Sequence, residues 1–114
     1  MRRRPDILAV ALATLALSAA AQSPSAPPAF VQRDKGHCLA CHQVPEGAGP
    51  ATRADLGPRL AGTRMRELGR ARLRELIEDP TRANPGTVMP PFGRHRILEA
   101  AEIDRIVEYL HALP

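Results

Sequence analysis

The feature that most constrains this chain is the five-residue motif Cys38-Leu39-Ala40-Cys41-His42. On a helical turn, residues at positions i, i+3 and i+4 project from one side, so two thiols and an imidazole are presented together. Haem c requires this geometry, because two thiols add to the vinyl groups on one porphyrin edge while the imidazole reaches the iron from one face. The motif therefore predicts one haem c, attached covalently through Cys38 and Cys41 and ligated by His42.

Three other uses of this motif compete with haem attachment. Two cysteines of an exported protein often form a disulfide. A thiol-redox site of the Cys-x-x-Cys kind is expected in a βαβ context, which this sequence does not show. A zinc site would need a fourth ligand, and the chain has only two cysteines. Haem attachment is the favoured interpretation.

The first 21 residues have the three parts of a secretory signal. Basic residues at positions 2–4 precede an apolar run at 7–17, and small residues end at Ala21. A membrane span needs roughly 20 apolar residues, and this run is shorter. We predict a cleaved signal peptide at 1–21, export to the periplasm, and no membrane span in the mature protein.

The mature chain is small and poor in aromatic residues. Cleavage after Ala21 would leave 93 of the 114 residues, with no Trp, one Tyr and two Phe. Three arginines and one aspartate would be removed, so the net charge would fall from +4 to +2. This small excess gives no argument for nucleic-acid binding. A domain of this kind buries little apolar surface, so a cofactor is expected to complete its core.

The remaining sequence reads as a linker followed by one helical domain. Residues 22–29 contain three prolines among Ser and Ala and are predicted to be a flexible linker, with the cytochrome domain at 30–114. Helices are expected at about 30–39 and at 64–78, where Gly69 weakens the second prediction and Asp79-Pro80 ends it. No segment alternates with a period of two, so the predicted fold class is all-α.

The clearest helix lies at the C-terminal end. Its apolar residues recur at i, i+3, i+4, i+7 and i+10 and form one stripe: Ile103, Ile106, Val107, Leu110 and Leu113. Glu99 and Glu102 suit the positive end of the helix dipole, although no Ser or Thr cap precedes them.

A second motif, Gly57-Pro58-Arg59-Leu60-Ala61-Gly62, resembles the Gly-Pro-x-Leu-x-Gly turn of class I cytochromes c. The resemblance implies that the carbonyl of Pro58 accepts the Nδ1 proton of His42. That bond would fix the tautomer in which Nε2 faces the iron. The alternative is an ordinary turn.

The second axial ligand is predicted to be Met89. It lies between Asn84 and Gly93, where Pro90 forces Met89 into an extended conformation and a strap could cross the haem face. Met65 is expected to pack in the core of the helix at 64–78. Met65, a histidine or an open site stays an alternative to Met89. A Met ligand implies a higher potential than a second histidine.

Several other polar residues are candidates for surface roles. His37, His95 and His111 are interpreted as surface groups rather than ligands. Arg66, Arg70 and Arg74 follow one another at i+4 and form a basic stripe. This stripe could meet an acidic partner, although a solvated helix face is the favoured interpretation.

Three stretches together resemble SoxX, the small monohaem subunit of the SoxAX cytochrome complex of thiosulfate oxidation. They are Gly36 to His42, Leu76 to Gly93 with its Asn-Pro and Met-Pro-Pro-Phe-Gly segments, and Ile97 to Leu110. Two positions depart from the expected pattern, because His37 replaces the usual Asn and Glu99 stands where a Thr commonly caps the last helix.

This resemblance implies a role in sulfur oxidation. SoxAX joins thiosulfate oxidatively to a cysteine of the carrier SoxYZ, as an L-cysteine S-thiosulfotransferase. The bond-forming site would belong to a SoxA-like partner in a heterodimer, so no catalytic residue is expected on this chain. Electrons would pass through the iron held by His42 and Met89 to a small soluble cytochrome c.

Two rival functions remain open. One is a free-standing cytochrome c that carries electrons to a terminal oxidase or reductase. The other is a haem enzyme or gas sensor with a vacant sixth site.

Overall fold

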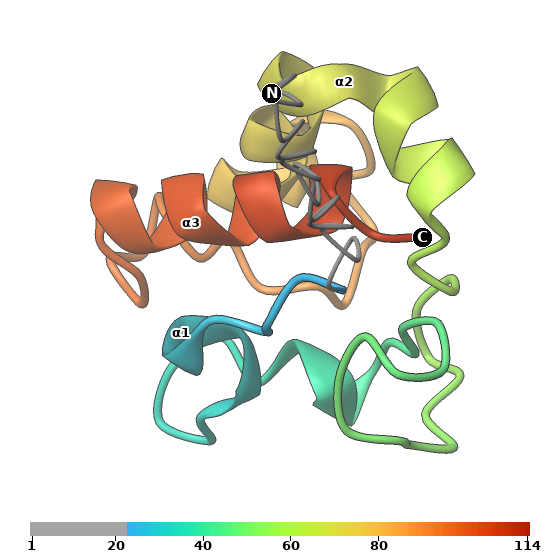
Figure 1. The fold of residues 1–114 in the computed structure, drawn as a ribbon. Helices are drawn as coiled ribbons and strands as arrows, with labels where there is room; N and C mark the ends of the chain where they lie inside the picture. Colours follow the sequence, from blue (N-terminus) through green and yellow to red (C-terminus); the bar gives the residue numbers. More distant parts are fainter. Residues whose placement is uncertain (1–22) are drawn as a thin grey trace, which may run out of the picture.

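The structure is a computed structural model that describes residues 23–114, and the predicted signal peptide lies outside this range (Figure 1). Its elements are α1 (Pro28–Val31), η1 (Cys38–Ala40), α2 (Gly62–Glu78), η2 (Pro80–Arg82) and α3 (Ala100–His111). Residues 23–114 form helices and turns without a strand, which confirms the predicted all-α class. Within the same residues, no helix has the length and apolar character needed to cross a bilayer.

Helix α3 lies at the centre of the fold, between α2 and the segment that contains α1 and η1 (Figure 1). Every residue of its predicted apolar stripe is buried, including Leu113 just beyond the helix end. The helix starts without a Ser or Thr because the Glu102 carboxylate accepts a hydrogen bond from the backbone N–H of Glu99 at 2.9 Å. This contact is one half of a capping box.

Helix α2 packs against α3 and is divided by a kink at Gly69. Gly69 has φ 77° and ψ 162°, a conformation that is essentially restricted to glycine. Met65 on the first segment and Leu73 and Ile77 on the second are buried, so the predicted core role of Met65 is confirmed. The helix ends at Glu78 before Asp79-Pro80, as predicted.

The basic stripe of α2 faces α3. Arg70 donates to both carboxylate oxygens of Glu108, at 2.8 and 3.1 Å. Arg74 pairs with Asp104. Arg66 donates to the Leu113 carbonyl at 2.6 Å, so these guanidinium groups bind acceptors within the molecule.

The predicted helix over 30–39 is wrong. α1 ends at Val31, and the backbone N–H of Gly36 donates to the Ala29 carbonyl at 2.9 Å, which folds the segment back on itself. His37 then adopts a left-handed conformation with φ 43° before η1 begins. The polar residues 33–35 followed by a glycine favour a turn over a helix. α1 also begins at Pro28, before the predicted start of the domain, and Ala29 is buried.

Tyr109 of α3 connects this helix to α1 and to the loop that follows η1. Its ring packs edge-on against Phe30, with 4.9 Å between ring centroids. Its hydroxyl donates to the Ala48 carbonyl at 2.8 Å. These contacts hold α1 and the loop after η1 against α3.

Candidate haem-binding site

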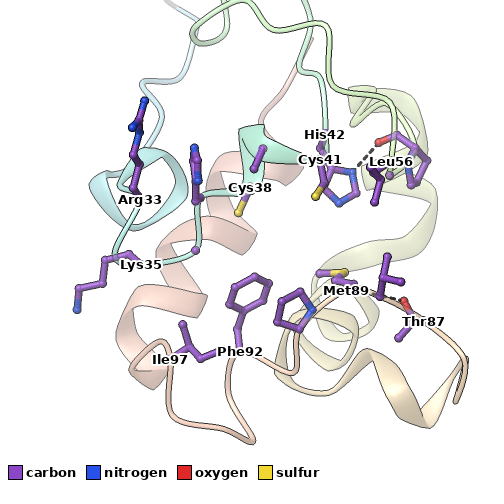
Figure 2. Close-up of a pocket in the computed structure, with 17 residues that line it drawn as sticks. Arg33, Lys35, Cys38, Cys41, His42, Leu56, Thr87, Met89, Phe92 and Ile97 are labelled. Atoms are coloured by element: carbon purple, nitrogen blue, oxygen red, sulfur yellow. Dashed lines mark hydrogen bonds between the residues drawn. The ribbon is translucent and has the colours of Figure 1, made fainter.

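A cavity of about 440 Å³ opens between η1 and the loop that follows η2 (Figure 2). This volume lies in the range of small-molecule and cofactor sites. The residues that line it come from four segments of the chain: Arg33, Lys35, Gly36, His37, Cys38, Ala40, Cys41, His42, Leu56, Gly57, Pro58, Thr87, Val88, Met89, Pro90, Phe92 and Ile97. All five residues predicted to bind the cofactor are among them.

The Cys-x-x-Cys-His motif forms a single helical turn on one wall of this cavity. The backbone N–H groups of Cys41 and His42 both donate to the Cys38 carbonyl, at 3.2 and 2.9 Å. This turn brings all three side chains to the cavity (Figure 2). The arrangement is the one that the sequence spacing predicted.

Both thiols of the motif are free. Burial raises the pKa of the Cys38 thiol to about 12. Thiol-redox sites work by lowering the pKa of a cysteine, so this environment is the opposite of what a redox pair needs. Within residues 23–114, no three His, Cys, Asp or Glu side chains are grouped as a metal site would require. The raised pKa of Cys38 therefore argues against the thiol-redox interpretation.

The His42 ring is fixed from its Nδ1 side. Nδ1 lies 2.7 Å from the carbonyl oxygen of Pro58, and a carbonyl can only accept, so Nδ1 carries the proton. The other nitrogen, Nε2, is then a free lone-pair donor. Gly57 makes this approach feasible, because a Cβ at this position would lie 2.3 Å from His42 Cε1.

Met89 lies across the cavity from His42, on the loop that follows η2 (Figure 2). Its backbone N–H donates to the Thr87 hydroxyl at 3.1 Å, which fixes the chain beside it. Met65 is buried in α2 and does not line the cavity. Among the predicted alternatives, only His37, which has a left-handed backbone conformation, also lines the cavity.

Apolar residues that the sequence did not single out complete the cavity. Phe92 is buried on its floor, and Ile97 lies beside it (Figure 2). Leu56 and Val88 line the cavity and remain 70% and 77% exposed. The Pro-Pro-Phe-Gly segment gave a signal for Phe92, whereas nothing local to Leu56 marked it as part of a site.

The residues present fit haem c. Two free thiols lie on one turn with an imidazole whose Nδ1 is already bonded, and a thioether faces that imidazole from the opposite wall. Apolar side chains at the mouth and floor offer the surface that a porphyrin would cover.

The fold and the site together define a c-type cytochrome, an electron-transfer protein with covalently bound haem c. The chain belongs to the family described as cytochrome c oxidase, cbb3-type, subunit III, which it matches over residues 25–110. No curated protein matches the sequence.

Among solved structures, the chain is similar to a chain in the crystal structure of SoxXA from P. pantotrophus. The two share 22% identity with a TM-score of 0.61 over 73% of this chain and 74% of the other. The nearly equal coverage means that the two chains have similar lengths. This likeness confirms the class I cytochrome c fold.

Proposed function

We propose that this protein is a monohaem electron-transfer cytochrome in which Cys38 and Cys41 form the thioethers and His42 and Met89 are the axial ligands. The observation that carries this proposal is the His42 ring, which is held by Pro58 at 2.7 Å and faces Met89 across one cavity. When bound, haem c supplies an iron centre that is oxidised and reduced by one electron.

The residues of the chain set the environment of that centre. The Pro58 carbonyl holds the imidazole in one tautomer and orientation, so Nε2 is the atom that would bind the iron. Met89 offers a neutral thioether, which favours a higher potential than a second imidazole would. Phe92 and Ile97 line the cavity with apolar surface, and an apolar environment around the haem would also influence the potential.

We further propose that the chain is a SoxX-like subunit that works in the periplasm. The resemblance of its Asn-Pro and Met-Pro-Pro-Phe-Gly segments supports this, as does the structural likeness to a chain of similar length from SoxXA. A SoxA-like cytochrome would then be its partner in a heterodimer and would hold the bond-forming site. A SoxYZ-type carrier would supply the sulfur acceptor, and a small soluble cytochrome c would take the electrons.

Copurification tests this assignment. A C-terminally tagged chain, isolated from cells that grow on thiosulfate, is expected to bring down a second c-type cytochrome in equal amount. Deletion of its gene should stop growth on thiosulfate but not on an organic substrate. Recovery of a lone monomer, together with normal growth of the deletion strain on thiosulfate, would end the sulfur assignment.

A carrier that delivers electrons to a terminal oxidase is the second candidate. The description of the matched family, subunit III of a cbb3-type oxidase, favours it specifically. In that case the tagged chain should copurify with oxidase subunits. Its deletion should then reduce cyanide-sensitive oxygen uptake on organic substrates and leave thiosulfate consumption unchanged.

A further inference from the structure

The loop that carries Met89 is closed at a narrow neck. It leaves α2 at Glu78 and returns to the same residue, because the backbone N–H groups of Gly93 and Arg94 both donate to the Glu78 carbonyl, at 3.1 and 3.0 Å. Residues 79–92 therefore form a closed loop whose two ends meet at the C-terminus of α2.

A buried carboxylate joins the two limbs of this neck. Among residues 23–114, Asp79 is the one charged residue that is buried, with 3% of its surface exposed. One of its oxygens accepts from the backbone N–H of Thr81 at 3.1 Å and from the Thr81 hydroxyl, both on the outgoing limb. The other oxygen accepts from an Arg94 N–H on the returning limb at 3.3 Å and lies 3.5 Å from Arg82 Nε.

Most of the loop beyond the neck is exposed, including residues 82–86. Between the buried Pro80 and Phe92 no residue is fully buried, and Met89 is half-buried with its side chain packed against the hydrophobic core. Hydrogen bonds within the loop, such as Thr87 N–H to the Asn84 carbonyl at 3.0 Å, shape its tip but do not attach it to the body of the protein. The position of the loop therefore depends on the neck and on the packing of Met89.

Burial of a carboxylate is costly unless its hydrogen bonds and counter-charges are supplied. Here two donors and two guanidinium groups supply them, and all come from the loop and its neck. Removal of the charge would leave Arg94 without its buried acceptor and would loosen the junction of the two limbs.

We propose that Asp79, through Thr81 and Arg94, is a positioning residue that keeps the Met89 loop closed over the haem. This inference rests on the proposed ligation by Met89. An open loop would withdraw the thioether, so the fraction of open molecules sets how readily an external ligand reaches the sixth site.

The test compares three variants of the haem-loaded protein. Asp79→Asn keeps the shape and the Thr81 contact but removes the charge, and Arg94→Gln removes the returning-limb contact from an exposed residue. Asp104→Asn is the matched control, because it removes a carboxylate that pairs with Arg74 between α2 and α3, away from the loop. The readouts are the methionine-to-iron charge-transfer band of the ferric protein, the rate of CO binding to the ferrous protein, and the urea midpoint of unfolding.

Asp79→Asn and Arg94→Gln are each expected to bind CO about tenfold faster than wild type, since a charge-assisted hydrogen bond closes the loop. They should also lose the charge-transfer band at urea concentrations below the unfolding midpoint. Asp104→Asn should shift the midpoint while its CO rate stays within about twofold of wild type.

Two kinds of result would overturn the inference in different ways. If both loop variants shift the unfolding midpoint but keep the wild-type CO rate and band, Asp79 is only structural. If Asp79→Asn does not fold, an unchanged CO rate in Arg94→Gln leads to the same conclusion. If wild type itself lacks the band and binds CO as fast as the variants, then the Met89 ligation of the proposed function is wrong.

Discussion

His42 is the residue that depends most closely on its immediate neighbours. Its ring is hydrogen-bonded to Pro58 and stands against the backbone of Gly57, so the two residues fix both its tautomer and its position. Met89, in contrast, is placed by a loop and has no comparable contact to its own sulfur. The two axial ligands should therefore respond differently to substitution.

Gly57→Ala should disturb the His42 side of the site. The added Cβ would lie 2.3 Å from the imidazole, and overpacking of this kind costs about 1–3 kcal/mol. We expect a lower urea midpoint and a reduced yield of haem-loaded protein, measured from the ratio of haem absorbance to protein. Gly86→Ala is the control, because its nearest neighbour would be Asn84 Oδ1 at an ordinary 3.7 Å. Equal haem content in the two variants would contradict the proposed packing around His42.

Met89→Ala should keep the haem attached and open the sixth site. Loss of the thioether is expected to lower the reduction potential by on the order of 0.1 V. Potentiometric titration and CO binding measure these two effects. Met65→Leu is the matched control, since Met65 is a buried core residue of α2 and should affect only stability. An unchanged potential in Met89→Ala would assign the ligand to another residue.

Among the helices, α2 is kinked because Gly69 interrupts it. In a regular helix, Gly→Ala stabilises by about 1 kcal/mol. Gly69 has a positive φ, which an alanine adopts only with strain. Whether Gly69→Ala raises or lowers the free energy of unfolding therefore distinguishes a regular α2 from a kinked one.

Gly69→Ala is predicted to lower the free energy of unfolding by about 1–3 kcal/mol. Urea unfolding followed by circular dichroism measures it. Because Gly69 does not line the cavity, the haem spectrum should not change. An increase in stability would show that α2 is regular and that the kink is absent.

The sequence predicted those elements whose signals are local. The apolar stripe of α3, the end of α2 before Asp79-Pro80 and the Cys-x-x-Cys-His turn each depend on residues within a few positions of one another. The predicted helix at 30–39 does not form, because the backbone N–H of Gly36 donates to the Ala29 carbonyl and this turn replaces helical hydrogen bonds. The pairing of Asp79 with Arg94 has no local sequence signal, since it needs the loop to return to α2.

Across the protein, acidic residues join segments that are distant in the sequence. Donation from the Thr81 hydroxyl, helped by Arg94 and Arg82, lowers the pKa of Asp79. The hydrogen bond from Arg70 lowers the pKa of Glu108, which links α3 to α2. A carboxyl with a lowered pKa stabilises the fold at any pH above its ordinary pKa, which is 3.8 for Asp and 4.5 for Glu. This stabilisation is lost as the pH falls through the lowered pKa.

The urea midpoint of the haem-loaded protein should therefore fall as the pH drops below about 4.5 and should change little between about pH 5 and 7. Glu108→Gln should make this decline shallower, because the carboxylate that Arg70 binds is then absent at every pH. The measurement is a series of urea titrations across this range. A midpoint that stays constant down to about pH 3 would contradict the assigned role of these acids.

Covalent attachment of one haem to an exported chain is tested most directly by the intact mass of the exported protein, recorded together with its visible spectrum. The expected mass is that of residues 22–114 plus one haem. The reduced spectrum should be typical of a c-type cytochrome, and the ferric form should show a methionine-to-iron band. A compactly folded, colourless protein with the mass of the polypeptide alone would contradict haem attachment.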